Sequence, residues 1–381
     1  MTEPASPAPA PAPSAEADDD ARPDALDSFE ASRRRSEAIE EGLRSTPQRY
    51  RVLTGDRPTG ALHVGHYFGS LQNRVRLQNL GVEVTIVIAD YQVLTDREGT
   101  EAIPANVQEL VLDYLATGLD PDNGRTCIFA HSQVPALNQL LLPFLTLVSM
   151  GELDRNPTVK EEIEAAGLTT VNAGMYTYPV HQAADILFCK GNVVPVGRDQ
   201  LAHLELTRKI ARRFNQRYAR AVPVFPEPEG LLSEAPKILG LDGSQKMSKS
   251  RNNAIMLRAT ADETARLIKR ATTDTERRIT YDPERRPAVA NLLLLISLCT
   301  GERPEHIAER IGDGGGGALK QELTTALNDT LAPLRARRAE LAKDAPAVVR
   351  RVLSAGCARA NAMADATLAE VRAAMNMSYG L

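Results

Sequence analysis

The sequence lacks long hydrophobic runs and closely spaced cysteines, and each absence excludes a class of protein. No apolar run in the 381 residues reaches the length of a membrane-spanning helix, and the N-terminus has no charged-then-apolar signal pattern. Wide cysteine spacing argues against a disulfide framework or a zinc knuckle, so we expect a cytoplasmic protein without a membrane partner. The four cysteines, which we expect to be small buried side chains, are Cys127, Cys189, Cys299 and Cys357.

A strong net charge is also missing, and the existing charge is unevenly distributed. The formal net charge is −4. Residues 1–45 contain 11 acidic and 5 basic side chains, which leaves 40 basic and 38 acidic side chains for the other 336 residues. A near-neutral body can bind nucleic acid through a local basic patch, but its overall charge does not require such a partner.

Composition divides the chain into three parts. Residues 1–20 are rich in proline and alanine and then acidic, which is typical of disorder, and we assign 1–45 to a disordered tail. Within it, the stretch 27–44 has a helical pattern with few large apolar residues, so any helix there is expected to be peripheral. Residues 46–259 form the predicted catalytic domain, and residues 260–381 form a helical domain.

The middle part alternates strand-like and helix-like patterns. Short apolar runs at 49–55, 82–94 and 125–132 are separated by helical patterns, the longest at 103–115. This alternation predicts an α/β fold with a Rossmann-like, doubly wound parallel sheet. Ligands bind such sheets at the carboxyl ends of the strands, where Gly55 and Asp90 are expected.

After residue 260 the strand signal disappears, and long amphipathic patterns predict only helices. The glycine run GDGGGG, at 312–317, resembles a phosphate loop. It follows no strand and precedes no Gly-Lys-Ser/Thr, so we interpret it as a flexible connector.

The stretch VLTGDRPTGALHVGH, residues 52–66, contains two of the six histidines around a glycine. A strand, a Gly/Pro loop and a helix N-terminus together form an anion site, because unpaired backbone N–H groups point to one place. Beside it, His63 and His66 are able to donate hydrogen bonds to phosphate, and Gly65 allows a flat group such as a purine to approach. A zinc site is the rival interpretation, but no local cysteine or carboxylate completes the ligand set. Taken alone, the pattern also fits a loop with chance histidines.

A second cluster, GLDGSQKMSKSRNNAI at 240–255, adds mobile lysines. Lys246 and Lys249 are three residues apart, between glycine and two asparagines. Ammonium groups on a turn-rich segment suit the neutralisation of charge on a triphosphate as it splits. The alternative is a solvated lysine loop.

Together these segments resemble class I aminoacyl-tRNA synthetases, whose two ATP motifs look like PTGALHVGH and KMSKS. The segment YPVHQAADILFCKGNVVPVGRDQLAHLELTR at 178–208, and GELDR at 151–155, resemble the tryptophanyl-tRNA synthetase family in particular. The resemblance runs from about residue 51 to near the C-terminus. It implies a tryptophan–tRNA ligase that uses ATP with Mg²⁺, has no resident metal, acts on L-tryptophan and tRNA(Trp), and is a homodimer with an anticodon-binding helical domain.

The resemblance also implies roles for single residues. The catalytic residues are His63, His66, Lys160, Lys246 and Lys249. The ATP contacts are Arg57, Pro58, Thr59, Gly65, His66, Gly197, Arg198, Asp199, Ile238, Lys246, Met247, Ser248, Lys249 and Ser250. The tryptophan contacts are Gln92, Tyr178, Gln182, Asp185 and Gln200, with Tyr178 and Gln200 at the α-amino group and Asp185 at the indole N–H.

A carboxylate at Asp185 selects a ring that carries a hydrogen-bond donor, because phenylalanine would leave the carboxylate unpaired. Tyrosine also carries a donor at its far end, so this reasoning leaves tryptophan and tyrosine open. The bland alternative is a surface or helix-capping carboxylate. Only the family resemblance favours tryptophan.

Three positions depart from the commoner family pattern: Arg57 replaces glutamine, Gln92 replaces histidine and Gln182 replaces methionine. From Gln92 and Gln182 we hypothesise a divergent second copy that tolerates a tryptophan-like inhibitor. A non-catalytic paralogue that binds tRNA or tryptophan is a rival function, against which the intact motif histidines and lysines argue. Another nucleotidyltransferase is a second rival, and the presence of KMSKS and a helical C-terminal part disfavours it.

Two arginine-rich helical segments are expected to contact tRNA phosphates, although each is also an ordinary solvated helix face. They are Arg208, Lys209, Arg212, Arg213 and Arg217 in the first segment, and Arg335, Arg337 and Arg338 in the second.

Overall fold

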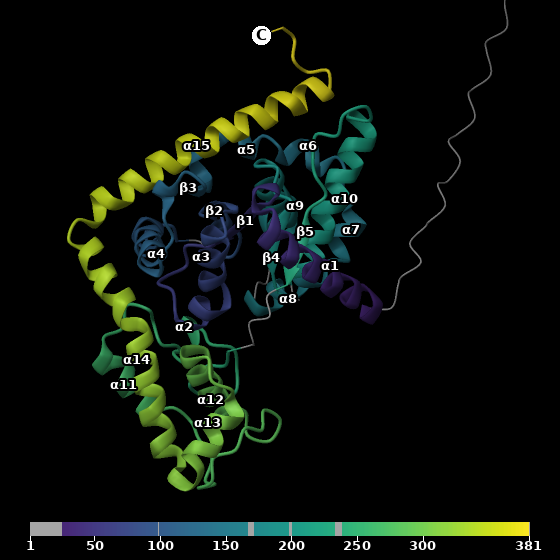
Figure 1. Cartoon of the computed structure of the whole chain (residues 1–381). Coiled ribbons are helices and arrows are strands. Elements are labelled where there is room, and N and C mark those ends of the chain that lie inside the picture. The colour runs from purple at the N-terminus through teal and green to yellow at the C-terminus, as the bar shows by residue number, and fades with distance from the viewer. Residues whose placement is uncertain (1–24, 98, 167–170, 198–199, 233–237, 381) are drawn as a thin grey trace, which may run out of the picture.

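A five-stranded parallel sheet lies at the centre of the computed structural model, which describes residues 25–97, 99–166, 171–197, 200–232 and 238–380 (Figure 1). The strands lie in the order β3-β2-β1-β4-β5, and every pair is parallel. The predicted doubly wound sheet is therefore confirmed. The strands are β1 (Arg51–Asp56), β2 (Glu83–Ile88), β3 (Thr126–Ala130), β4 (Val193–Val196) and β5 (Glu229–Leu232).

The strand order creates a switch point between β1 and β4. From β1 the chain proceeds outward through β2 to β3, and it then returns to the other side of β1 as β4 and β5. The loops after β1 and β4 therefore diverge, which opens a crevice at the carboxyl ends of these strands. Every residue of β3 is buried, as is every residue of β2 after Glu83, as the continuous apolar runs predict for a sheet covered on both faces.

Helices cover both faces of the sheet, and neighbouring strand residues belong to different cores. Val52 packs into one core with the helices that follow β1 and β2, whereas Leu53 packs into the other with the helices before and after β4. The helices on the first face are α2 (Val64–His66), α3 (Gln72–Asn79) and α4 (Ile103–Thr117). The second group consists of α5 (Pro135–Asn138), α6 (Leu141–Leu145), α7 (Met150–Asp154), α9 (Ala173–Leu187) and α10 (Leu201–Tyr218). Helix α8 (Pro157–Ala166) packs on α9 in a small separate cluster.

The prediction of disorder up to residue 45 is wrong for its second half, because residues 25–45 form helix α1 (Ala25–Ser45). Ile39 and Leu43 of this helix are buried. Ser36 accepts a hydrogen bond from the backbone N–H of Leu232 at 2.9 Å, so α1 covers the edge strand β5. The few apolar residues of this segment suffice because they lie on one face. Residues 1–24 lie outside the described residues.

After residue 260 the described chain is helical, as predicted, but the helices do not all stay together. Four of them form the lobe at the bottom of Figure 1, and α15 runs back across the sheet domain. There Gly356 of α15 lies against the backbone of Ile128, where a Cβ would be 1.8 Å from the carbonyl oxygen. The boundary at residue 260 stays a prediction. The helices are α11 (Ala261–Lys269), α12 (Pro287–Thr300), α13 (Pro304–Ile311), α14 (Gly315–Ala342) and α15 (Ala345–Ala374).

The glycine run is not the flexible connector that we expected. Gly312–Gly314 form a 3₁₀ turn, and Gly315–Gly317 are the first residues of α14. The positive φ values of Gly312 and Gly315, 50° and 73°, explain why glycine is needed at this tight junction between α13 and α14.

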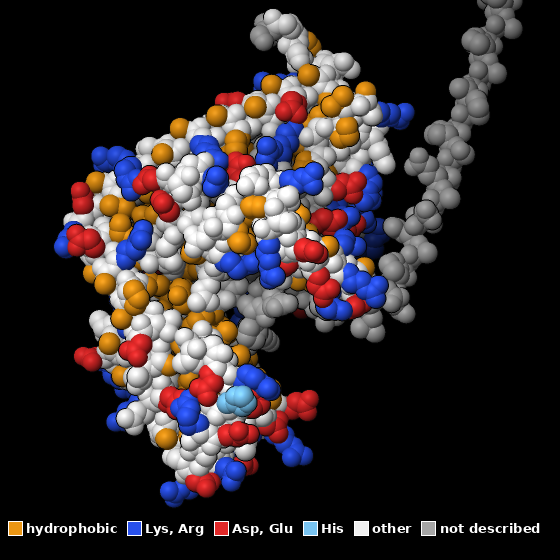
Figure 2. Space-filling model, viewed as in Figure 1, with side chains coloured by type: hydrophobic (Ala, Val, Ile, Leu, Met, Phe, Trp, Pro, Cys, Tyr) orange, Lys and Arg blue, Asp and Glu red, His pale blue; other side chains and the backbone are white. Residues whose placement is uncertain are grey.

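Charges of both signs are interspersed over the face in Figure 2, without a large patch of one sign. This agrees with the near-neutral body that the sequence indicates. None of the described helices is both long and apolar enough to cross a membrane.

Candidate active site

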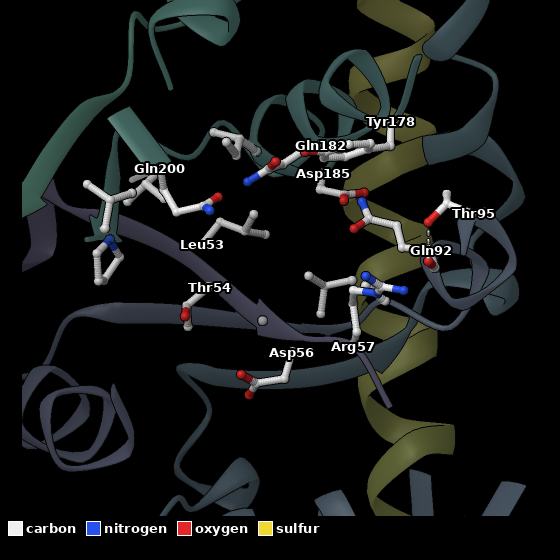
Figure 3. Close-up of a pocket in the computed structure, with 17 residues that line it drawn as sticks. Leu53, Thr54, Asp56, Arg57, Gln92, Thr95, Tyr178, Gln182, Asp185 and Gln200 are labelled. Atoms are coloured by element: carbon white, nitrogen blue, oxygen red, sulfur yellow. Dashed lines mark hydrogen bonds between the residues drawn. The ribbon is translucent and has the colours of Figure 1, made fainter. Parts of the chain in front are cut away.

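A cavity of about 330 Å³ opens at the switch point between β1 and β4 (Figure 3). Small-molecule sites have volumes of this order and larger. Its walls come from β1, the loops after β1 and β2, α9 and β4. All five predicted tryptophan contacts line it, together with Arg57: Gln92, Tyr178, Gln182, Asp185 and Gln200.

Helix α9 supplies one wall of the cavity because of its spacing. Asn172 caps its N-terminus by accepting a hydrogen bond from the backbone N–H of Met175 at 2.8 Å. Tyr178, Gln182 and Asp185 follow at intervals of four and three residues, which places them on one face of the helix. Figure 3 shows these three side chains over the cavity, opposite Thr54 and Asp56 of β1.

Asp185 is 2% exposed and is engaged by a residue that sequence reasoning missed. Its Oδ1 lies 2.6 Å from Nε2 of His131, which is fully buried. The two atoms meet as a close ion pair rather than as a well-aligned hydrogen bond. The alternative interpretation of Asp185, as a carboxylate at the surface or at a helix cap, is therefore wrong.

Tyr178 and Gln200 lie at the other predicted end of the amino acid. The Tyr178 hydroxyl lies 3.0 Å from Nε2 of the buried His203, which fixes the phenol ring. Gln200 follows the turn after β4 and donates its backbone N–H to the carbonyl of Gly197 at 3.1 Å. Gly197 is exposed beside the cavity, as an ATP contact there requires.

The floor of the cavity is charged and rigid. Asp56 at the end of β1 accepts hydrogen bonds from Arg74 and Tyr114, each at 2.6 Å. Burial raises the pKa of Asp56, but the charge of Arg74, the hydrogen bonds from Arg74 and Tyr114 and the charge of His66 together outweigh burial and lower it. Arg57, which follows, forms an ion pair with Asp96, so it is held at the rim.

The two motif histidines lie against each other, with their rings tilted by 44°, beside the loop after β1. Their ring centroids are 3.8 Å apart, and the backbone N–H of His63 donates to Nδ1 of His66 at 3.2 Å. In the neutral ring of His66, Nε2 then carries the proton and is free to donate. From Val64 the helical chain continues without a break through a π turn, 67–71, into α3.

Both histidines are held neutral. Burial, then the neighbouring His66 and Lys246, lower the pKa of His63 to about 3. Burial also lowers the pKa of His66, although Asp56 opposes the shift. Neutral imidazoles donate hydrogen bonds without adding positive charge, so the charge for binding an anion comes from the lysines.

Gly65 has a packing role that the sequence did not reveal, and the approach of a purine to it stays a prediction. A Cβ at this position would lie 3.0 Å from the His63 ring and 3.6 Å from Cβ of Met247. The missing side chain therefore lets the first motif contact both its own histidine and the second motif. Pro58 and Thr59 hold the preceding loop, since the Pro58 carbonyl accepts a bond from Asn106 at 2.9 Å and the Thr59 N–H donates to Arg57 at 2.8 Å.

Backbone hydrogen bonds join the two motifs, which are about 180 residues apart in the sequence. The backbone N–H of Val64 donates to the Ile255 carbonyl at 2.9 Å, and that of Leu257 donates to the Leu62 carbonyl at 3.0 Å. In the second motif, Met247 donates its backbone N–H to the carbonyl of the buried Ile238 at 3.2 Å.

The second motif itself is a tight turn. Ser248 donates its backbone N–H to the side chain of Asn253 at 2.8 Å, and Asn252 has a positive φ of 52°. Lys246 and Lys249 are both exposed, and the Lys249 ammonium lies beside Gly60 of the first loop. The turn thus presents both ammonium groups on the side of the first motif. The backbone of Ser250 belongs to the same turn, a 3₁₀ segment at Lys249–Arg251.

Some predicted residues are not brought to the cavity. Lys160 is exposed on α8 and is not part of the cavity lining. Of the described residues predicted in the two motifs, Arg57 alone is in that lining, so the structure brings the two motifs to each other beside the cavity rather than into it. Arg198 and Asp199 lie outside the described residues.

Several expected tRNA contacts are engaged within the protein instead. Arg208 pairs with Glu229 at 2.7 Å and Arg213 with Glu152 at 2.8 Å. Arg338 is largely buried between Glu109 and Asp113, at 2.6 and 2.7 Å. For these arginines the structure favours a role in holding helices together. Arg335 donates to Asn328 and Thr264, Arg212 pairs with Glu227, and Lys209, Arg217 and Arg337 have at least part of their surface exposed.

Sequence comparison shows which family the chain belongs to. A family model described as "tRNA synthetases class I (W and Y)" matches residues 46–332. The chain is 43% identical over 336 residues to the tryptophan–tRNA ligase of Treponema pallidum, covering 86% of this chain and 97% of that one. It is 42% identical over 337 residues to the tryptophan–tRNA ligase of Clostridium longisporum, with the same coverage.

Structure comparison agrees. The chain is similar in structure to tryptophanyl-tRNA synthetase from Campylobacter jejuni, solved with ADP and tryptophan, with a TM-score of 0.73 at 28% identity over 86% of this chain and 99% of that chain. Tyrosyl-tRNA synthetase from Archaeoglobus fulgidus has the same fold, with a TM-score of 0.60 at 22% identity over 79% of this chain and 93% of that one. Fold similarity therefore extends to both amino-acid specificities.

Proposed function

Because the chain belongs to the class I tRNA synthetases for tryptophan and tyrosine, we propose that it is a tryptophan–tRNA ligase. In the first step the tryptophan carboxylate attacks the α-phosphorus of ATP, and tryptophanyl-adenylate forms as pyrophosphate leaves. In the second step a terminal ribose hydroxyl of tRNA(Trp) attacks the activated carbonyl, and AMP leaves. Neither step needs a side-chain nucleophile, so catalysis consists of positioning and charge stabilisation.

ATP lies along the joined motifs in this proposal. His63 and His66 donate hydrogen bonds to the phosphates, and Lys246 and Lys249 stabilise the negative charge that develops on pyrophosphate. The exposed Lys249 next to Gly60, and the charge of Lys246 felt by His63, support this arrangement. The side chains described at this end are imidazoles and ammonium groups, so Mg²⁺ fits best as a partner of the phosphates themselves, whose charge it would neutralise. Lys160 reaches the phosphates only if α8 moves towards them.

Tryptophan occupies the cavity, with its ring against α9. Asp185 accepts the indole N–H, and Tyr178 and Gln200 hold the α-amino group. Gln92 and Gln182 also line the ring end of the cavity, so two amides stand beside the indole. The hypothesis that these amides alter inhibitor tolerance stays a prediction.

The tRNA and the assembly belong to the same proposal. Basic residues that keep exposed surface, such as Arg217 and Arg337, are the best candidates for tRNA phosphate contacts. The helical lobe after residue 260 would read the anticodon, and two copies of the chain would form a homodimer. Four free cysteines suit a protein that works in the cytoplasm.

One observation carries the proposal: a buried carboxylate lines the switch-point cavity, and the two motifs are joined at the loop that follows the cavity strand β1. The test is amino-acid-dependent ATP–pyrophosphate exchange, with tryptophan and tyrosine compared, followed by aminoacylation of tRNA(Trp). We expect exchange with tryptophan only. Exchange with tyrosine would overturn the assignment of tryptophan as the substrate. No exchange by the folded protein would favour a paralogue that only binds its ligands.

A further inference from the structure

Behind the cavity wall, three side chains form a buried polar cluster that the proposed reaction does not use in full. His131 begins a 3₁₀ turn (His131–Gln133) directly after β3, and His181 and Asp185 are four residues apart on α9. Asp185 lines the cavity, whereas the two histidines lie outside its lining. The cluster therefore supports Asp185 from behind.

His131 is fixed from several sides. Its Nε2 lies 2.6 Å from Oδ1 of Asp185, and its ring is stacked on that of His181 with centroids 4.2 Å apart at 12°. His181 is in turn fixed by Asn138 of α5, whose Oδ1 lies 2.7 Å from the histidine Nε2. Since both imidazoles are anchored, the carboxylate has one preferred rotamer.

The charges of the cluster are balanced. Burial lowers the pKa of His131, but the negative charge of Asp185, the contact with it and then the charge of Asp90 outweigh burial and raise the pKa. Burial lowers the pKa of His181, and the adjacent His131 lowers it further, against the pull of Asp185. Tyr91 also faces His131, with ring centroids 5.9 Å apart. The surroundings thus favour the charged form of His131 and the neutral form of His181.

We propose that His131 is a positioning residue for amino-acid recognition: it holds Oδ1 of Asp185, so that the other carboxylate oxygen is presented to the ring N–H of the substrate. The inference rests on the proposed role of Asp185 at the indole. His131 does not touch the substrate in this arrangement. Its contribution is to keep a buried carboxylate oriented and charge-compensated, which sharpens the preference for a ring with an N–H donor.

A bound cation is the alternative occupant of the cluster. The possible ligand atoms of His131, His181 and Asp185 all lie within 4.8 Å of one another. However, the Asp185 oxygen already faces His131, and Nε2 of His181 faces Asn138. Because these ligand atoms already contact protein groups, the cluster favours a shared proton between His131 and Asp185 rather than a bound metal ion.

The test uses the full-length protein and two substrates in ATP–pyrophosphate exchange. One is tryptophan, and the other is its analogue with sulfur in place of the ring N–H, 3-(benzothiophen-3-yl)alanine. The variants are His131→Leu, which removes the donor, and His131→Gln, which keeps a donor without the charge. His306→Gln, at an exposed histidine of α13, is the matched control.

In His131→Leu we expect the KM for tryptophan to rise about 10- to 100-fold, the effect of one hydrogen bond to a charged group, with kcat and the KM for ATP much less affected. The preference for tryptophan over the sulfur analogue should fall by a similar factor. His131→Gln should recover part of that preference, and His306→Gln should match the wild type. The Gln variant keeps the test valid even if His131→Leu does not fold.

Three results would overturn the inference. If both His131 variants leave the tryptophan-to-analogue ratio at the wild-type value, His131 is only a packing residue. If Zn²⁺ inhibits the wild type in competition with tryptophan and His131→Gln abolishes that inhibition, the cluster is a metal site. Failure of the wild type itself to exchange with tryptophan would reject the proposed function, and this inference with it, which separates the two proposals.

Discussion

The two ends of the crevice solve different problems with different kinds of residue. At the ATP end, the lysines are exposed, and backbone hydrogen bonds between two distant loops bring them together. At the amino-acid end, Asp185 and His131 are buried and compensate each other. The flexible triphosphate would bind to exposed lysine side chains. The uncharged indole ring would bind to a buried pair, Asp185 and His131, whose orientation is fixed before the substrate arrives.

This difference has an energetic consequence. Exposed ammonium groups contribute little to folding, because water screens them until the ligand arrives. A buried ion pair is part of the folded core, and the loss of one partner leaves a charge or polar group without compensation. Substitutions at the ATP end should therefore lower activity without lowering stability. Substitutions at the amino-acid end should lower both.

The largest expected effect is at the ATP end. In Lys249→Ala, kcat for tryptophan-dependent pyrophosphate exchange should fall about 100- to 1000-fold, as for the loss of a charge that stabilises the transition state. The thermal midpoint should stay near the wild-type value, because Lys249 is exposed. Lys343→Ala, at an exposed lysine far along the chain, is the control. A thermal shift as large as the loss of activity would contradict the contrast between the two ends.

Asp185→Asn should affect both properties. Loss of the charged acceptor should lower kcat/KM for tryptophan about 10- to 100-fold, and loss of the compensating charge beside His131 should cost about 2 kcal/mol of unfolding free energy. Exchange kinetics and urea unfolding measure the two effects. Asp344→Asn, at an exposed carboxylate, should change neither. If Asp185→Asn is as stable as the wild type, activity and stability are not coupled at the amino-acid end, and the contrast with the ATP end is wrong.

Gly65→Ala tests the contact between the motifs at a smaller scale. The new Cβ would lie 3.0 Å from the His63 ring, so the imidazole must shift. We expect the KM for ATP to rise about fivefold to tenfold, in line with about 1 kcal/mol of overpacking, with the KM for tryptophan unchanged. Gly69→Ala is a matched control in the π turn that follows, where a Cβ has no neighbour within 4 Å. Equal effects of the two substitutions would argue against a special role for Gly65.

The smallest expected effect is on acid stability. Burial and the neighbouring charges lower the folded-state pKa of His63 from 6.5 to about 3, so the unfolded chain binds more protons between these values. This contribution to stability is present above pH 6.5 and is lost as the pH falls towards 3. His63→Gln should thus lose fewer degrees of thermal midpoint than the wild type between pH 7 and pH 5. His306→Gln should follow the wild-type curve, and a parallel curve for His63→Gln would show that His63 is not held neutral.

Most of the proposed ATP site could be predicted from local residue types. The spacing of His63, Gly65 and His66 after a strand, and the lysines of the second motif, predicted where an anion would bind. Sequence reasoning gave no sign of the contact between Gly65 and Met247, because Met247 comes from a segment far along the chain. The ion pairs of several arginines in the expected tRNA segments were also unpredictable, since a helical pattern does not reveal the glutamates that another element places opposite them.

Of the buried pair at the amino-acid end, only Asp185 could be predicted from the sequence. Asp185 stood out through its family resemblance, but His131 gave little signal beyond a rare histidine directly after a buried strand. The two residues are 54 positions apart, and they meet because β3 and α9 are neighbours on one face of the sheet. The cap that α1 places on β5, and the return of α15 to β3, likewise depend on contacts between distant segments.

The sequence by itself determined the periodicities, and with them the α/β class, the helical C-terminal part and the anion-binding chemistry of the two motifs, because these depend on neighbours within a few residues. Tertiary structure alone decided which charges face solvent and which face each other. Burial and partner choice depend on the strand order and on the helices that cover each face. Those contacts turn Asp185 and His131 into one unit, and they leave Lys246 and Lys249 exposed beside the neutral histidines.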